Sequence, residues 1–131
     1  TNSTANRLKY FPTSNKTYYS FELGNALFVV LDPYLYTTTK PNSDGWQWTL
    51  GKDQYDWLRT TLESSKVAYK FVFIHQLVGG DNQGRGGIEL AKYYEWGGYN
   101  LDNSYGFNSY RENWGKPIHQ LLIDNKIQLP C

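Results

Sequence analysis

The stretch FVFIHQLVGG, from Phe71 to Gly80, sets four apolar residues directly before a histidine and a glycine-rich loop. An uninterrupted apolar run of this kind is typical of a β-strand that is buried on both faces. We therefore expect a strand from Tyr69 to Ile74 that carries the imidazole of His75 at its carboxyl end. Ligands of helix-covered sheets bind at that end of the strands, so His75 is the first candidate for a functional side chain.

The segments before this strand predict a sheet that is covered by helices. YYSFE, residues 18–22, alternates like a strand, and ALFVVL, residues 26–31, has the composition of a fully buried one. The two would form a hairpin, and Asp32-Pro33 would end its second strand. From residue 52 to residue 65 the apolar spacing is that of a helix. A strand, a helix and a second buried strand in this order indicate the α/β class.

The rest of the chain predicts loops and shorter elements. We expect, in chain order, an irregular lead-in over residues 1–17, a long loop over 34–48, a short helix near 88–94, a helix over 116–124 and a strand that opens at 127–129. Pro117 suits the first turn of the last helix, and Asn125 can end that helix in the left-handed conformation. The length of 131 residues fits a single domain.

Composition excludes several classes of protein. The net charge is +1, from 13 basic and 12 acidic residues, so neither a nucleic-acid partner nor a charged membrane surface is indicated. No run approaches the ~20 apolar residues of a membrane span. Cys131 is the single cysteine, which excludes an internal disulfide and a cysteine-based zinc cluster. The aromatic content of 18% is typical of proteins that line clefts with Tyr and Trp, and equally of β-rich extracytoplasmic proteins.

The loop GGDNQGRGG, residues 79–87, is the second candidate for a functional element. Its five glycines allow the backbone to approach a ligand closely, and Arg85 can clamp a phosphate with its planar guanidinium. A surface loop with a solvated arginine is the alternative. The Lys-Ser/Thr ending of a phosphate-binding Walker loop is missing, which disfavours a nucleotide site. For His75 the alternative is a core histidine bonded to a backbone carbonyl, and for His119 we expect a residue on the flank of a helix.

The order of these elements resembles that of the calcineurin-like metallophosphoesterases, in particular their purple acid phosphatase-like branch. In that family a hairpin, a loop, a Gln-x-x-Trp-Leu helix and a strand that ends in a metal-binding histidine follow one another. The resemblance is carried by YYSFELGNALFVVLD (18–32), QYDWL (54–58), FVFIH (71–75), RGGIELAKYYEWGG (85–98) and WGKPIHQLLIDNKIQL (114–129). Together these segments span nearly the whole chain, about residues 18–129.

The resemblance implies a fold, a reaction and site residues. The fold would be part of a helix-covered β-sandwich. The reaction would be the hydrolysis of a phosphate ester by a water activated at two metal ions, Fe, Zn or Mn, about 3.5–4 Å apart. His75 would be one metal ligand and Arg85 would contact the substrate, with Trp46, Trp48 and residues 93–96 around it.

The resemblance also implies that this chain is an incomplete catalytic-domain fragment, the later part of a larger enzyme. The family's Asp-x-His, Gly-Asp-x-x-Asp and Gly-Asn-His-Asp/Glu segments would lie before Thr1, and its Gly-His-x-His segment would follow the strand that opens at Ile127. We therefore expect no tightly bound metal and no activity in the chain alone, and self-association through an exposed sheet edge. Gln76 replaces the second histidine or small residue that relatives often carry, which leaves the role of this position open.

A function of a different class is also compatible with the composition. Exposed Tyr and Trp side chains on a rigid scaffold stack on sugar rings, so the chain could be a stand-alone carbohydrate-binding module. Such modules are usually all-β, whereas at least two helices are expected here. The helical content therefore favours the phosphoesterase resemblance over the carbohydrate-binding module.

Overall fold

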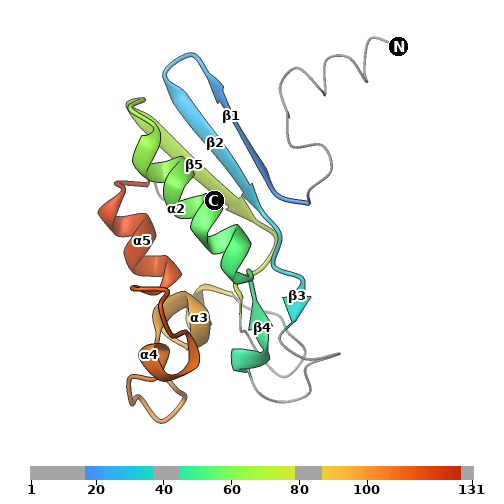
Figure 1. The fold of residues 1–131 in the computed structure, drawn as a ribbon, viewed down its shortest axis with the longest axis vertical. Helices are drawn as coiled ribbons and strands as arrows, with labels where there is room; N and C mark the ends of the chain where they lie inside the picture. The colour runs from blue at the N-terminus through green and yellow to red at the C-terminus, as the bar shows by residue number, and fades with distance from the viewer. Residues whose placement is uncertain (1–16, 37–44, 79–86, 128–131) are drawn as a thin grey trace.

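The fold is built around a three-stranded mixed sheet (Figure 1). The computed structural model describes residues 17–36, 45–78 and 87–127. The strands of this sheet are, in chain order, β1 (Tyr19–Leu23), β2 (Ala26–Leu31) and β5 (Tyr69–Ile74). β2 lies in the middle, antiparallel to β1 and parallel to β5. The predicted hairpin and the predicted strand before His75 are confirmed as strands. The expected burial of β2 and β5 on both faces is wrong, because only every second residue of β2 is buried and Phe73 of β5 is 40% exposed.

The helix α2 (Lys52–Ser64) lies across one face of this sheet (Figure 1). Its apolar side chains recur at helical spacing, and three of them are fully buried: Tyr55, Leu58 and Leu62. In β2 every second side chain is buried: Leu27, Val29 and Leu31. The Lys70 ammonium group donates to the Leu62 carbonyl at 2.8 Å, which ties β5 to the same helix. Burial of each such leucine stabilises the fold by about 1.5–3 kcal/mol.

The segment expected as a loop over residues 34–48 contains ordered structure, so that expectation is wrong in part. β3 (Leu35–Tyr36) pairs antiparallel with β4 (Trp48–Thr49), and a 3-10 turn, η1 (Gly45–Gln47), precedes β4. These elements are too short to show a sequence period. They form because the indoles of Trp46 and Trp48 are buried in the core.

The residues after the glycine-rich loop form four short elements rather than the two expected. They are η2 (Ile88–Leu90), α3 (Tyr94–Gly97), α4 (Phe107–Tyr110) and α5 (Ile118–Asp124). The helix expected near 88–94 is found only in part: the 3-10 helix η2 covers its first three residues, and the helical conformation is interrupted between Leu90 and Tyr94, whose φ of 60° is left-handed. The short helices of this half contribute Trp96 and Phe107 to the core.

The last helix is confirmed with different ends. Pro117 is the residue that caps α5 rather than a member of its first turn. Asn125 has φ −101°, so it does not end the helix in the left-handed conformation, and Lys126 with φ 56° makes that turn instead. The side chain of Asn125 donates to the Leu121 carbonyl at 2.9 Å, which caps the last turn from within.

The mixed α/β class is confirmed, with a three-stranded mixed sheet and the helices α2 to α5. No helix within the described ranges is long and apolar enough to cross a membrane. The strand expected at residues 127–129 and the loop around Arg85 lie outside the described residues, apart from Ile127.

Candidate functional site

The carboxyl ends of the two parallel strands form the candidate site. The register pairs Leu31 of β2 with Ile74 of β5. The next residues along the two strands, Asp32 and His75, therefore leave the sheet at the same edge. His75 is exposed, so its imidazole is available to a ligand at this edge. The predicted position of His75 at the strand end is confirmed, and its role as a metal ligand stays a prediction.

Asp32 organises the turn that follows β2. One carboxylate oxygen accepts a hydrogen bond from the Tyr34 backbone N–H at 2.9 Å, and the other accepts one from the Thr17 hydroxyl. This local carboxylate-to-backbone bond is a common way to stabilise a turn at an Asp-Pro sequence. The turn brings the Tyr34 ring to 5.9 Å from the His75 ring, measured between centroids. Tyr34 is thus a residue of the site that the sequence did not identify.

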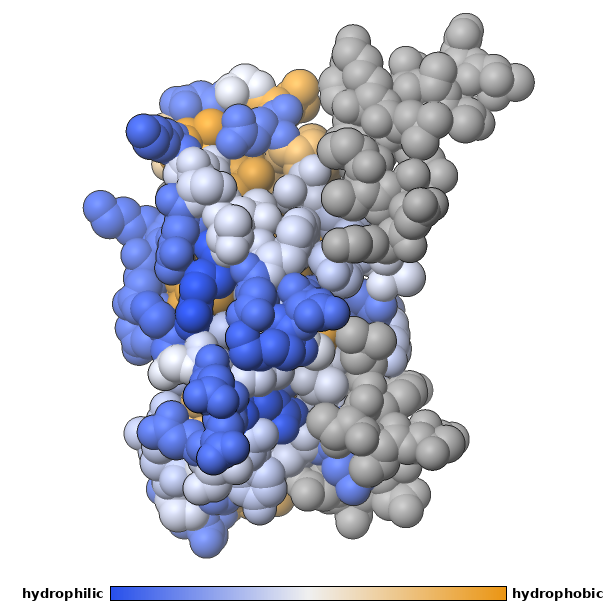
Figure 2. All heavy atoms as spheres, in the orientation of Figure 1, coloured by the Kyte–Doolittle hydropathy of each residue, from blue (hydrophilic) through white to orange (hydrophobic). Residues whose placement is uncertain are grey.

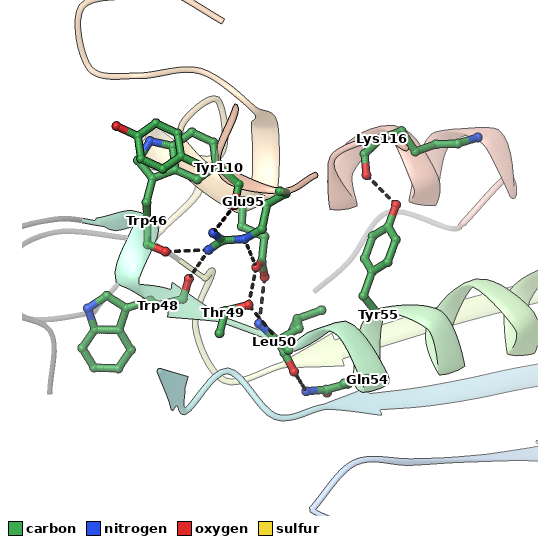
Figure 3. Close-up of polar contacts among 11 residues, drawn as sticks. Trp46, Trp48, Thr49, Leu50, Gln54, Tyr55, Glu95, Tyr110 and Lys116 are labelled. Atoms are coloured by element: carbon green, nitrogen blue, oxygen red, sulfur yellow. Dashed lines mark hydrogen bonds and ion pairs between the residues drawn. The ribbon is translucent and has the colours of Figure 1, made fainter. Parts of the chain in front are cut away.

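Gln54 of α2 fixes the end of β2 from the buried side. Its side-chain oxygen accepts from the Asp32 N–H at 2.8 Å, and its side-chain nitrogen donates to the Asp32 carbonyl at 3.0 Å. The same nitrogen donates to the Leu50 carbonyl at 2.8 Å (Figure 3). Both polar atoms of the buried amide are therefore hydrogen-bonded, and these bonds connect the end of β2 to the start of α2. This gives the Gln of the QYDWL motif a structural role.

The described residues fit only a part of a binuclear metal site. In residues 17–36, 45–78 and 87–127 no three His, Cys, Asp or Glu side chains come together as metal ligands. Asp32 follows β2 at the same end of the sheet as His75, and its carboxylate oxygens already accept hydrogen bonds. One imidazole cannot hold two ions. No chemical step is therefore derived through a metal for the chain alone.

His119 lies in a different environment. It is exposed on α5, at a pocket of about 190 Å³ whose other lining residues are all apolar: Leu77, Ile88, Trp96, Leu122, Ile123 and Ile127. None of these side chains can join an imidazole in binding a metal. The expectation of a helix-flank histidine is therefore confirmed in position, and the pocket offers no partner for metal binding.

The aromatic residues expected around the substrate are mostly core residues instead. Trp46, Trp48, Tyr94 and Trp96 are all buried. The Trp46 indole N–H donates to the Asn100 side-chain oxygen at 2.8 Å, so its polar group is satisfied inside the protein. All four side chains belong to the hydrophobic core cluster of the described residues, so packing accounts for their burial.

Glu95 and Arg111 form a buried ion pair that the sequence did not predict. The Arg111 Nε donates to Glu95 Oε1 at 2.7 Å, and the glutamate side chain is 0% exposed. The carboxylate also accepts from the Thr49 hydroxyl and from the Leu50 N–H, the latter at 2.8 Å (Figure 3). Burial raises the pKa of Glu95, and the Arg111 charge offsets part of that effect.

The guanidinium of Arg111 is satisfied on all sides. Its Nη2 donates to the carbonyls of Trp46 and Trp48, at 2.6 and 3.1 Å, and its Nη1 donates to the Tyr110 carbonyl at 3.0 Å. The charge also lies 5.4 and 5.5 Å from the ring centroids of Trp46 and Trp114. Every polar atom of the pair is engaged within the fold, so the pair joins η1, β4, α3 and α4 and offers no free group for chemistry.

Arg85 and most of the glycine-rich loop lie outside the described residues, so the predicted substrate contact is not placed. Gln76, directly after His75, is partly buried and has interactions within the fold. Comparison with protein-family models, with curated proteins and with solved structures finds no match to this chain. The geometry of the site therefore has to carry the functional argument by itself.

Proposed function

We propose that this chain is part of a metal-dependent phosphoesterase in which His75 is one ligand of a binuclear metal centre. The observation that carries the proposal is the exposed imidazole at the carboxyl end of a parallel strand–helix–strand unit. Side chains at this end of a helix-covered sheet point into the crevice where ligands bind. A neutral imidazole is a ligand for Fe, Zn and Mn.

The local structure around His75 supports the proposal. Gln54 holds the end of β2 through its two hydrogen bonds to the backbone of Asp32, and the turn after Asp32 brings Tyr34 beside His75. A metal ligand needs such support, because the residues behind it determine how well its geometry is kept. The order of hairpin, Gln-x-x-Trp-Leu helix and histidine-ended strand agrees with the phosphoesterase resemblance.

The proposal also assigns the other metal ligands, the substrate contact and the second sheet of the enzyme. The other ligands would come from segments outside residues 1–131, so the chain alone would neither hold two metal ions nor hydrolyse phosphate esters. Arg85 would contact the phosphate of the substrate with its planar guanidinium. The sheet would belong to a helix-covered β-sandwich, in which α2 covers one face and a second sheet covers the other.

The sequence of the DNA on both sides of this segment tests the proposal directly. We expect Asp-x-His, Gly-Asp-x-x-Asp and Gly-Asn-His segments upstream and a Gly-His-x-His segment downstream, in one reading frame. A reading frame that ends on both sides without these segments would refute the phosphoesterase assignment. Chelator-sensitive hydrolysis of p-nitrophenyl phosphate by the purified chain would refute the claim that its metal site is incomplete.

A second measurement tests His75 in the chain itself. The imidazole signals of both histidines are followed by NMR during titration with Mn²⁺, with His119 as the internal control. We expect the signals of His75 to broaden first, because the carboxylate of Asp32 lies at the same sheet edge, whereas His119 borders an apolar pocket. Equal broadening of the two histidines would remove the structural reason to prefer His75.

Carbohydrate binding remains the second candidate because of one surface feature. Tyr110 is half-exposed and lies flat on the buried Trp46, with ring centroids 4.5 Å apart and planes 8° apart. A ring held rigidly in this way can stack on a sugar face. Binding on a glycan array that is lost in a Tyr110→Ala variant would favour this function over the phosphoesterase.

A further inference from the structure

The pocket beside His119 has the composition of a small-molecule site. We call it the α5 pocket; its lining is His119 and the six largely apolar side chains that accompany it there. They come from the turn after β5, from η2, from α3 and from α5 and its C-terminal flank, so tertiary packing creates the pocket. Protein pockets for small ligands are typically apolar, with a few polar groups that orient the ligand.

Two polar groups of the α5 pocket are open to a ligand. Trp96 is only 4% exposed, and its indole N–H makes no hydrogen bond within the described ranges. Arg59 Nε is the one fully buried side-chain nitrogen or oxygen without a partner among the described residues, so the Trp96 N–H is not sealed from solvent. The exposed imidazole of His119 likewise has no hydrogen-bond partner in that part of the chain. A ligand in the pocket can therefore pair with both groups.

The volume of the α5 pocket fits one aromatic ring. An engineered apolar cavity of about 150 Å³ binds benzene, and this pocket has a volume of about 190 Å³, which leaves room for a substituent. The indole of Trp96 offers an aromatic wall, against which another ring packs well. His119 is the only lining residue that can carry a charge, so a charged ligand would lose its hydration without a fixed counter-charge. A neutral ligand is therefore favoured.

We propose that the α5 pocket binds a small neutral aromatic alcohol, of which phenol is the simplest member. The ring lies among the apolar side chains, the hydroxyl oxygen accepts from the Trp96 N–H, and the hydroxyl proton is donated to the His119 imidazole. A hydroxyl group both donates and accepts, whereas a carbonyl only accepts and a bare ring does neither. This binding site requires no metal ion, so it goes beyond the phosphoesterase proposal and does not depend on it.

The surroundings of the α5 pocket suit a small ligand better than a protein partner. Of its apolar lining residues only Ile88 and Ile123 are exposed, by 83% and 55%. On the face shown in Figure 2 the surface over α2 and α5 is mostly hydrophilic, so no broad apolar surface extends from α5 across that face. A stable protein interface covers about 800 Å² on each partner, far more than two isoleucines present.

NMR titration of the chain with phenol, and separately with toluene, tests the proposal. The indole N–H signal of Trp96 is followed and is assigned by its absence from a Trp96→Phe variant. We expect a saturable shift of this signal with phenol and a dissociation constant of roughly 0.1–1 mM. Toluene is the matched probe, because it has the same number of heavy atoms and no hydroxyl group.

A His119→Ala variant separates the hydroxyl contact from the apolar contacts. It should raise the dissociation constant of phenol about 5-fold or more and change that of toluene by less than about 2-fold. Gln120→Ala is the matched control, since Gln120 is the exposed neighbour on α5 and does not line the pocket, and it should leave both constants within about 2-fold. If His119→Ala does not fold by circular dichroism, His119→Leu replaces it.

Two results would overturn the proposal. One is the absence of a saturable shift of the Trp96 signal with phenol up to roughly 10 mM, which would leave the pocket to another part of the polypeptide. The other is an equal loss of phenol and toluene affinity in the His119 variant, which would reduce the imidazole to a part of the apolar wall. Neither result bears on metal binding at His75, so failure here and failure of the phosphoesterase proposal are distinguishable.

Discussion

The buried ion pair between Glu95 and Arg111 allows a prediction whose magnitude follows from the structure. An Arg111→Met variant removes the guanidinium and leaves the Glu95 carboxylate buried, with only the Thr49 hydroxyl and the Leu50 N–H as partners. Loss of one partner of a buried pair costs about 3–5 kcal/mol. We expect this loss in the free energy of unfolding from urea denaturation at a pH of about 7.5.

A double variant separates the interaction energy between Glu95 and Arg111 from the energy of their contacts with other residues. Glu95→Gln removes the charge but keeps an acceptor, while Arg111 retains its bonds to three backbone carbonyls. The single variants should therefore not be additive, and Glu95→Gln with Arg111→Met should be more stable than their sum by about 2 kcal/mol or more. Strict additivity, or a cost below about 1 kcal/mol for Arg111→Met, would refute the view that this pair organises the fold.

The pH dependence gives the same reasoning a second test. Burial raises the pKa of Glu95 in the folded chain above its ordinary value of 4.5. The contribution of this raised pKa to the free energy of unfolding is therefore complete below the pKa of Glu95 in the unfolded chain. It is lost as the pH rises through the pKa of Glu95 in the folded chain. Glu95→Gln should remove this decline from a stability profile, which is measured between roughly pH 4 and pH 8. Arg111→Met should become less harmful at the acid end, because a protonated Glu95 needs no counter-charge.

Further variants test other contacts of the fold. Gln54→Met keeps the side-chain volume but removes three hydrogen bonds, so it should lower the free energy of unfolding by about 2–4 kcal/mol and shift the NMR signals of His75. Gly98→Ala should cost about 2 kcal/mol or more in thermal unfolding, since φ is 95° and a Cβ would lie 2.8 Å from the Tyr105 ring. Lys52→Ala breaks an exposed ion pair and should change stability by less than about 1 kcal/mol. A larger loss would contradict the view that this exposed ion pair contributes little to stability.

The sheet and its main helix could be predicted from sequence because their patterns are local. β2 is a continuous apolar run, β5 is apolar from Phe71 to Ile74, and α2 repeats its apolar residues at helical spacing over a 13-residue helix. A period of two or 3.6 residues is visible only when an element is long enough to repeat it. The predicted ends of these strands and of this helix therefore agree with the observed ends to within one residue.

The structure after the glycine-rich loop could not be predicted in the same way. Its helices α3 and α4 have four residues each, too few for a period, and are held by tertiary bonds. Glu95 and Arg111 are 16 residues apart, with no motif that connects them. An acidic residue between Tyr94 and Trp96 is the one local sign, because a charge within a buried aromatic run requires a partner.

In the candidate site, too, some residues can be predicted from local sequence and others depend on contacts between distant segments. His75 was predictable because a strand end is a local feature, whereas Tyr34 reaches it only through the turn at Asp32. The role of Gln54 depends on contacts over 22 residues, so the QYDWL motif alone could not reveal it.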